Sequence, residues 1–200
     1  MGKLIVTEFL TLDGVMEEPA WSLAYWNDTI AKFKLDELFA SGAHLLGRVT
    51  YEGFAQAWPD RKDEQGFADR MNSLPKYVVS TTMKIGDWQG TTIIRDKIVE
   101  EISKLKKTSG QDFLVAGSGT LVQTLVANNL VDELHLLVYP LMLGQGKRLF
   151  RDGIGNHDLD LIESRPMGSG VVLLLYGKKA KKKQDSEKVK DPVKDRPFEK

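Results

Sequence analysis

The order of strand-like and helix-like segments constrains the fold of this chain more than any other sequence feature. Over the first two-thirds, apolar β-rich segments alternate with segments of helical periodicity. Such alternation is typical of a parallel sheet whose strands are joined by crossover helices. In the last third, three strand-like segments follow one another without a helix, which favours an antiparallel edge. We therefore expect an α/β, three-layer fold with one mixed, mostly parallel sheet flanked by helices and antiparallel C-terminal strands.

The segments can be assigned approximate limits from their periodicity and from their turn and cap residues. The expected strands are 3–10, 43–46, 76–80, 91–94, 112–116, 133–138, 159–163 and 170–176. The expected helices are 27–41, 49–57, 67–72, 96–107 and 120–127, the fourth of them capped by Asp96. The segment 11–19, which follows the first strand, is expected to be a loop.

Composition limits the class of protein. The chain has 200 residues, of which 42% are hydrophobic, enough for one sizeable core. There is no cysteine, so disulfides and zinc-thiolate sites are excluded, and we expect no metal centre. No segment has the ~20 apolar residues of a membrane helix, and the start does not resemble a signal peptide. A cytoplasmic protein without a membrane partner is expected.

Charge divides the chain into a folded domain at 1–177 and a tail at 178–200. The tail holds ten basic and five acidic residues with two prolines and few apolar ones, so we expect it to be disordered. The remainder holds eighteen basic and twenty-three acidic residues. A basic surface for nucleic acid is therefore not expected on the folded domain.

Small polar residues and glycines gather where three expected parallel strands end. They are Gly47, Arg48 and Thr50; Ser80, Thr81 and Thr82; and Gly117, Ser118, Gly119 and Thr120. Ligands of open sheets bind at the carboxyl ends of the strands. Two of the three groups also begin a helix, where free N–H groups and the helix dipole favour anions. The pattern predicts a site for the phosphates of a dinucleotide, and Arg48 with the Ser/Thr cluster favours NADPH over NADH.

Each of these signals has a simpler structural interpretation. Gly47 can be only a tight turn, and Arg48 only a surface cation. The glycines at 117 and 119 lack the third glycine of the dinucleotide-binding fingerprint and the lysine of a phosphate-binding loop. The prediction therefore depends on the three groups occurring together.

Residues for substrate binding and catalysis are less clearly marked. Asp13 follows the first strand and is the best-placed acid, although an Asp-Gly turn with Gly14 explains it equally. Asp28 is a second candidate, with helix capping as the alternative. Trp21 and Tyr51 are candidates for a flat pocket that accepts a planar ring. The three histidines do not share the spacing of metal ligands, and we expect them to be structural.

An ordered set of motifs resembles the dihydrofolate-reductase-like superfamily, and in particular the riboflavin-biosynthesis reductases of the RibD C-terminal domain family. The motifs are Thr11–Gly14, Leu45–Glu52, Leu74–Ser80, Gly117–Gly119, Leu130–Glu133 and Pro140–Gly146. The similarity is closest to small stand-alone bacterial members and covers about residues 3–176.

The resemblance implies an NADPH-dependent reductase that transfers a hydride to a small heterocyclic or sugar-bearing substrate. Family members of the riboflavin pathway reduce 5-amino-6-(5-phosphoribosylamino)uracil and are commonly homodimers. The resemblance places the cofactor on the three groups named above, and the nicotinamide and substrate beside Asp13 and Gly14. The acid that binds pteridine in dihydrofolate reductases would fall near Asp28 or Thr29. A dihydrofolate reductase and a non-catalytic NADP-binding protein of the same fold are the alternatives.

Overall fold

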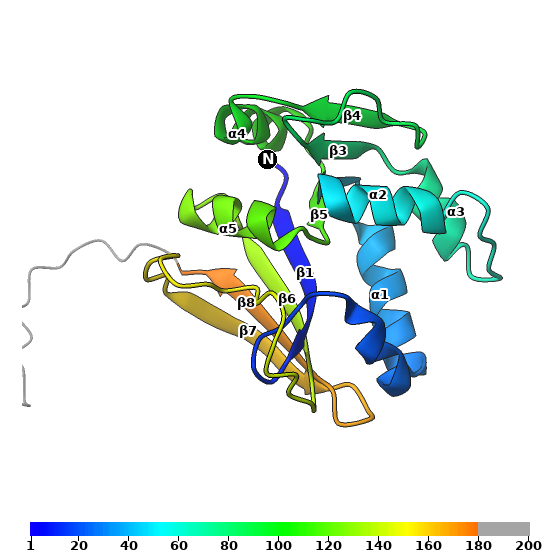
Figure 1. The fold of residues 1–200 in the computed structure, drawn as a ribbon, viewed down its shortest axis with the longest axis vertical. Helices are drawn as coiled ribbons and strands as arrows, with labels where there is room; N and C mark the ends of the chain where they lie inside the picture. Colours follow the sequence, from blue (N-terminus) through cyan, green and yellow to red (C-terminus); the bar gives the residue numbers. More distant parts are fainter. Residues whose placement is uncertain (180–200) are drawn as a thin grey trace, which may run out of the picture.

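A computed structural model describes residues 1–179, and its centre is one eight-stranded sheet (Figure 1). The strand order is β4-β3-β2-β5-β1-β6-β8-β7. The first six strands in this order run parallel, whereas β8 and β7 are antiparallel to their neighbours. The α/β mixed sheet with an antiparallel C-terminal edge is thus confirmed.

The strands are β1 (Leu4–Thr11), β2 (Ala43–Gly47), β3 (Lys76–Val79), β4 (Thr91–Ile94), β5 (Phe113–Val115), β6 (Glu133–Tyr139), β7 (Leu159–Pro166) and β8 (Val172–Lys178). The helices are α1 (Asp28–Ala40), α2 (Arg48–Ala57), α3 (Phe67–Ser73), α4 (Ile98–Thr108) and α5 (Gly119–Ala127), with a 3-10 helix η1 (Pro19–Tyr25). Strand β8 includes Lys178, which the sequence assigned to the tail. Residues 180–200 of the expected tail lie outside the described residues.

The helices form a layer on each face of the sheet. Leu38 of α1, Tyr51 of α2 and Met71 of α3 are buried together on one face. On the other face, Ile102 of α4 and Leu125 of α5 are buried against apolar residues of the central strands. This division follows from the crossover connections, which must return each helix over one face of the sheet before the next parallel strand.

The strand register determines which residue of β1 lies beside the end of β5. Val6 of β1 is paired with Val115, the last residue of β5. Strand β1 then continues to Thr11, paired on its other side with β6 up to Tyr139. Glu8 therefore lies level with Gly117, just where β5 ends. The second half of β1 therefore extends beyond the end of β5 and borders the site on that side.

Two local features were not anticipated from the sequence. The loop expected at 11–19 is present, but it leads into η1 after Glu18, which has a left-handed backbone with φ 46°. Helix α4 begins at Ile98 with Lys97 at its N-cap in a left-handed conformation, so Asp96 is not the cap. Left-handed backbone at a Glu or Lys is uncommon, and a sequence pattern gives no sign of it.

Candidate active site

The turn after β2 and the turn after β5 meet at one rim of the sheet. Strands β2 and β5 are neighbours, and each leads directly into a helix, α2 and α5. The backbone N–H of Gly47 donates a hydrogen bond to the carbonyl of Gly117, with N and O 3.1 Å apart. Two of the three groups predicted to bind the dinucleotide are therefore in direct contact.

This contact requires glycine on both sides. A Cβ on Gly47 would lie 2.3 Å from the Ser118 hydroxyl oxygen. Gly117 has φ +96°, and a Cβ there would lie 2.7 Å from Oγ1 of Thr50. The Gly117–Ser118 peptide bond is cis. Because Gly47 and Gly117 have no Cβ, the two turns can approach each other this closely.

The N-termini of the two helices offer hydrogen-bond donors at this rim. Neither Gly47 at the N-cap of α2 nor Ser118 at the N-cap of α5 makes a side-chain capping bond within residues 1–179. First-turn N–H groups without such a cap favour an anion, assisted by the helix dipole. The arrangement can hold a pyrophosphate between two helix starts.

Arg48 brings a permanent positive charge to the start of α2. Its Nη1 donates to both carboxylate oxygens of Glu52, one helical turn away, at 2.9 and 2.8 Å. The Arg48 side chain is 45% exposed. The guanidinium has five N–H donors, so it can bind a phosphate while keeping part of this contact.

The Ser/Thr cluster lies one strand further along the rim, after β3. The hydroxyl of Ser80 accepts hydrogen bonds from the N–H of Met83 at 2.9 Å and of Thr82 at 3.3 Å. Ser80 is buried, whereas Thr81 and Thr82 are exposed. Ser80 therefore shapes the turn, and the two threonine hydroxyls are the ones that face solvent.

Asp13 and Gly14 lie in the loop after β1 and connect it to the loop after β6. The Asp13 carboxylate accepts hydrogen bonds from the hydroxyl of Thr11 and from the N–H groups of Leu143 and Gly144, the last at 2.8 Å. These bonds, that from Thr11 first, lower the pKa of Asp13 to about 2. Asp13 is thus an ionised anchor between two loops, a state that does not suit a proton donor.

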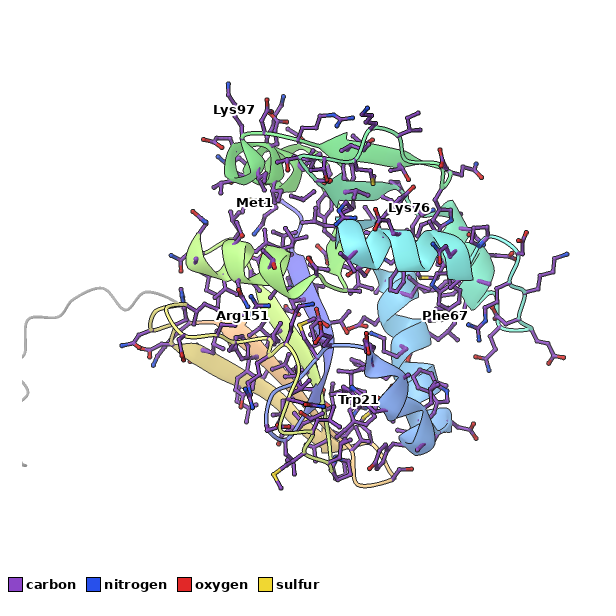
Figure 2. The ribbon with its side chains drawn as sticks, viewed as in Figure 1. Met1, Trp21, Phe67, Lys76, Lys97 and Arg151 are labelled. Carbon is purple, nitrogen blue, oxygen red and sulfur yellow. The ribbon has the colours of Figure 1, made fainter. Side chains whose placement is uncertain are left out.

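The remaining predicted residues occupy separate places. Tyr51 is buried in the core, where its hydroxyl accepts a hydrogen bond from the N–H of Trp88 at 2.9 Å, so it does not line an open pocket. Trp21, labelled in Figure 2, belongs to η1. Its ring packs edge-on against that of Tyr139, with ring centroids 5.3 Å apart. Asp28 is exposed in the first turn of α1, and the cap of that helix is the side chain of Asn27.

Two residues at the rim were not predicted from the sequence. Glu8 of β1 is 8% exposed, and its Oε1 has no hydrogen-bond partner within residues 1–179. Burial raises the pKa of Glu8 to about 8. Met16, in the loop after β1, places its sulfur 2.8 Å from where a Cβ of Gly119 would stand. A carboxylate inside an otherwise apolar strand was the available signal for Glu8.

A second buried polar group lies on the opposite face of β1. Glu37 of α1 is bonded to Lys34, to the hydroxyl of Thr7 at 2.9 Å and to Nδ1 of His135 at 2.6 Å. Burial alone would raise the pKa of Glu37, but Lys34 and His135 lower it. This network satisfies His135 as a structural residue between α1 and the sheet. Residues 1–179 contain no cluster of three or more side chains able to hold a metal.

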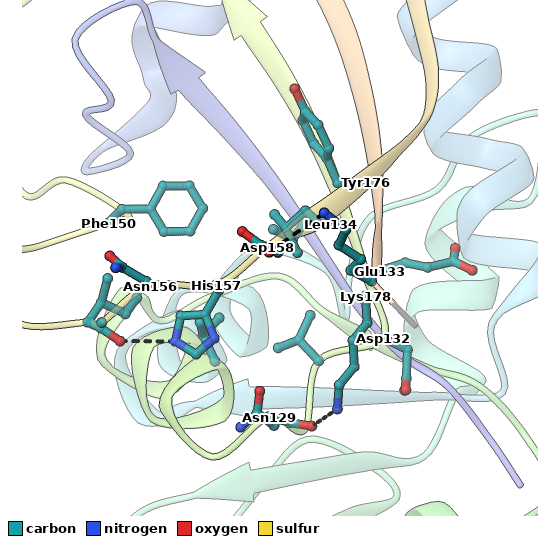
Figure 3. A pocket seen from close by; sticks show the side chains of 16 residues that line it. Asn129, Asp132, Glu133, Leu134, Phe150, Asn156, His157, Asp158, Tyr176 and Lys178 are labelled. Atoms are coloured by element: carbon teal, nitrogen blue, oxygen red, sulfur yellow. Dashed lines mark hydrogen bonds and ion pairs between the residues drawn. The ribbon is translucent and has the colours of Figure 1, made fainter. Parts of the chain in front are cut away.

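One hollow lies away from this rim. It lies beside the C-terminal end of α5 and is formed with β6, β8 and the loop 150–158, with a volume of about 640 Å³ (Figure 3). Its lining mixes apolar side chains such as Leu134 and Tyr176 with charged ones such as Asp132 and Lys178. Glu133 and Leu134 begin β6, so the hollow is at the opposite end of the parallel strands from the glycine turns.

This sheet order and rim define a protein of the dihydrofolate-reductase-like class. A riboflavin biosynthesis protein of provisional assignment from Shewanella sp. PV-4 has the same fold, with a TM-score of 0.71 at 22% identity, covering 89% of this chain and 99% of that one. Dihydrofolate reductase from Enterococcus faecalis, complexed with NADP(H), gives a TM-score of 0.61 at 14% identity over 90% of this chain and 98% of that one.

Residues 2–173 match the family described as the RibD C-terminal domain. The chain belongs to the RibD C-terminal domain family. It is also 34% identical over 181 residues to the uncharacterized protein YyaP of Bacillus subtilis (strain 168), covering 87% of this chain and 94% of that protein. Within residues 1–179, none of the helices is both long and apolar enough to cross a membrane.

Proposed function

We propose that this protein is an NADPH-dependent reductase of the riboflavin-biosynthesis type. The observation that carries the proposal is the hydrogen bond between Gly47 and Gly117, which joins two helix starts at one rim. Membership of the RibD C-terminal domain family supports it. So does the shared fold with a dihydrofolate reductase that is complexed with NADP(H).

The residues at the rim fit the phosphates of such a cofactor. Gly117, Ser118, Gly119 and Thr120 would hold the pyrophosphate together with Gly47 and Thr50. Arg48 and the exposed hydroxyls of Thr81 and Thr82, with Ser80 shaping their turn, would hold the additional phosphate of the adenosine ribose. The missing Cβ atoms and the absence of side-chain caps on α2 and α5 within residues 1–179 agree with this assignment.

When bound, NADPH would supply a hydride to an electrophilic carbon of the substrate. The chain has to orient the nicotinamide and exclude water. The loop after β1 can perform the second task, because Met16 already lies over the turn at Gly119. Asp13 holds this loop to the N–H groups of Leu143 and Gly144. Because its pKa is lowered to about 2, Asp13 would position this loop and would not donate the proton.

The substrate class that we propose is 5-amino-6-(5-phosphoribosylamino)uracil or a related ribosylaminopyrimidine. Dihydrofolate is less well supported, because Asp28 and Thr29, where an acid for pteridine was expected, are both exposed. On the sheet-facing side of the same helix, Ile30 is fully buried in an apolar cluster with Leu137.

Replacement of Arg48 by alanine tests the cofactor site. Because a charge-assisted hydrogen bond to phosphate contributes about 1.5–3 kcal/mol, we expect NADPH to bind roughly 10- to 100-fold more weakly. NADH, which lacks the additional phosphate, should be much less affected. Isothermal titration calorimetry of both nucleotides measures the difference.

Arg165→Ala on the exposed edge strand β7 is the matched control, and it should leave both affinities unchanged. Equal losses for NADPH and NADH in Arg48→Ala would place Arg48 away from the additional phosphate. Tight NADPH binding without oxidation by the pyrimidine, or by a panel of carbonyl, imine and pteridine compounds, would favour a non-catalytic NADP-binding protein.

A further inference from the structure

Glu8 is an unusual residue for the centre of a sheet. Its side chain is 8% exposed and lies in a strand whose other inward-facing residues on that face, Leu4, Val6 and Leu10, are apolar. Its Oε1 is buried and has no hydrogen-bond partner within residues 1–179. A buried carboxyl oxygen without a partner costs stability, and a polar group in that state at a functional rim is available to a ligand.

The position of Glu8 says which part of a ligand it faces. The strands stand in the order β3, β2, β5, β1 along the rim. Ser80, Arg48 and Gly117 follow the carboxyl ends of the first three strands, and Glu8, within β1, lies level with Gly117. Oε1 of Glu8 lies 3.7 Å from where a Cβ of Gly117 would stand. A dinucleotide with its additional phosphate near Arg48 and its pyrophosphate at Gly117 must extend its other end towards β1.

The protonation state of Glu8 determines what it can bind. Burial raises its pKa to about 8, Lys34 of α1 acts to lower it, and Glu37 of α1 acts to raise it. Gly117 of the neighbouring turn, which lies beside Oε1 of Glu8, is not ionisable. At neutral pH the side chain is therefore a neutral carboxylic acid, which has one O–H donor and one carbonyl acceptor.

A primary carboxamide has the complementary pair of groups, an N–H donor and a carbonyl acceptor. The nicotinamide end of a dinucleotide carries such a carboxamide. We propose that Glu8, as a neutral acid, binds this carboxamide through a pair of hydrogen bonds and so fixes the orientation of the nicotinamide ring. This inference rests on the proposed function, and it assigns to Glu8 a role in specificity for the nicotinamide half of the cofactor.

The test compares NADPH with a fragment that lacks nicotinamide, 2′-phospho-ADP-ribose, over a range of pH. Between pH 7 and 8 the NADPH affinity of the wild type should change little, and above pH 8 it should fall by about tenfold in total as the acid ionises. The fragment should bind with no such fall. Calorimetry or quenching of tryptophan fluorescence gives both dissociation constants.

Variants separate a binding role from a structural one. Glu8→Gln keeps the shape and still has a donor and an acceptor, so NADPH affinity should stay within about threefold of wild type at neutral pH and lose its fall above pH 8. Glu8→Ala should weaken NADPH by about tenfold at neutral pH and leave the fragment unchanged. Glu100→Gln, on the exposed face of α4, should behave as wild type.

These binding measurements can show separately whether the cofactor site exists and whether Glu8 contacts the nicotinamide. If neither NADPH nor the fragment binds to the wild type, the cofactor site itself is absent and both proposals fail. If both bind but NADPH affinity has no fall above pH 8, or Glu8→Ala weakens the two ligands equally, the assignment to Glu8 is wrong and the cofactor site stands.

Discussion

At Gly117 the backbone has φ +96°. A Cβ on this residue would lie only 2.7 Å from Oγ1 of Thr50, so the absence of a side chain leaves room for the Thr50 hydroxyl. The same residue accepts the hydrogen bond from Gly47 that joins the two turns. A residue with a side chain would have to move the helix start that carries Thr50. Gly117 is therefore required both for its left-handed backbone and for the close approach of Thr50, which belongs to α2.

Replacement of Gly117 by alanine should destabilise the protein by about 2–3 kcal/mol, from a left-handed backbone and a close contact together. NADPH affinity should fall as well, because the turn has to shift. Urea denaturation and calorimetry measure the two effects.

Gly110→Ala provides the control, since Gly110 has φ +68° with no atom within 4 Å of its Cβ position. It should cost only about 1 kcal/mol and leave NADPH binding intact. If Gly117→Ala and Gly110→Ala lost the same free energy of unfolding, the contact with Thr50 would not contribute to stability.

The sequence predicted individual elements well where periodicity and turn residues agree. Strand 91–94 and the end of α2 at residue 57 match the structure, and the helix after Gly117–Gly119 begins one residue earlier than predicted. The cap of α4 and the 3-10 helix η1 were not predicted, because both depend on left-handed backbone at Lys97 and Glu18. Tertiary contacts, which local sequence does not reveal, stabilise such conformations.

The buried side chain of Lys76 links β3 to α3 and to the segment before β4. Its side chain is fully buried at the start of β3 and donates to the carbonyls of Asn72, in α3, and Gln89, before β4. The ammonium also lies 4.2 Å from the ring centroid of Trp88. Lys76→Met would leave two carbonyls without this donor, so we expect the free energy of unfolding to fall by about 1–3 kcal/mol at pH 7.5.

Lys76 should also make the free energy of unfolding depend on pH in a definite direction. Burial lowers the pKa of Lys76 to about 8. Between pH 8 and the ordinary value of 10.5 the unfolded chain binds more protons than the folded one, so the contribution of Lys76 to stability rises with pH. Lys76→Met should lack this rise in urea denaturation, whereas Lys104→Met, exposed on α4, should retain it. A parallel pH profile in wild type and Lys76→Met would contradict the prediction.

At the scale of the whole molecule, the sequence predicted that two glycine-bearing helix starts serve one phosphate site at a common rim of the sheet, but it did not predict the order of the strands. The contact between Gly47 and Gly117 exists because β5 pairs with β2 on one side and β1 on the other. These residues are seventy positions apart, and their pairing depends on how the helices pack over the sheet. Glu8 was missed for the same reason, since its significance appears only when β5 is seen to end beside it.

The edge of the sheet bears on the assembly of the molecule. Strand β7 is the last in the order and has only β8 as a neighbour among residues 1–179, and Leu161 and Ile162 on it are 54% and 57% exposed. Exposed apolar residues on an edge strand favour association with another chain. Because the resemblance that the sequence showed implies a homodimer, we expect a second copy of this chain to cover β7.

Light scattering coupled to size-exclusion chromatography should give the wild type twice the mass of one chain. Ile162→Lys should shift the protein towards a monomer, because burying an unpaired charge at the interface costs several kcal/mol. Leu23→Lys, equally non-conservative at a residue 70% exposed in η1, should remain dimeric. A monomeric wild type, or a dimer that both substitutions leave intact, would show that β7 does not form the contact. Retention of NADPH binding by the Ile162→Lys monomer would in addition show that each chain holds a complete cofactor site, as the position of its rim within one sheet predicts.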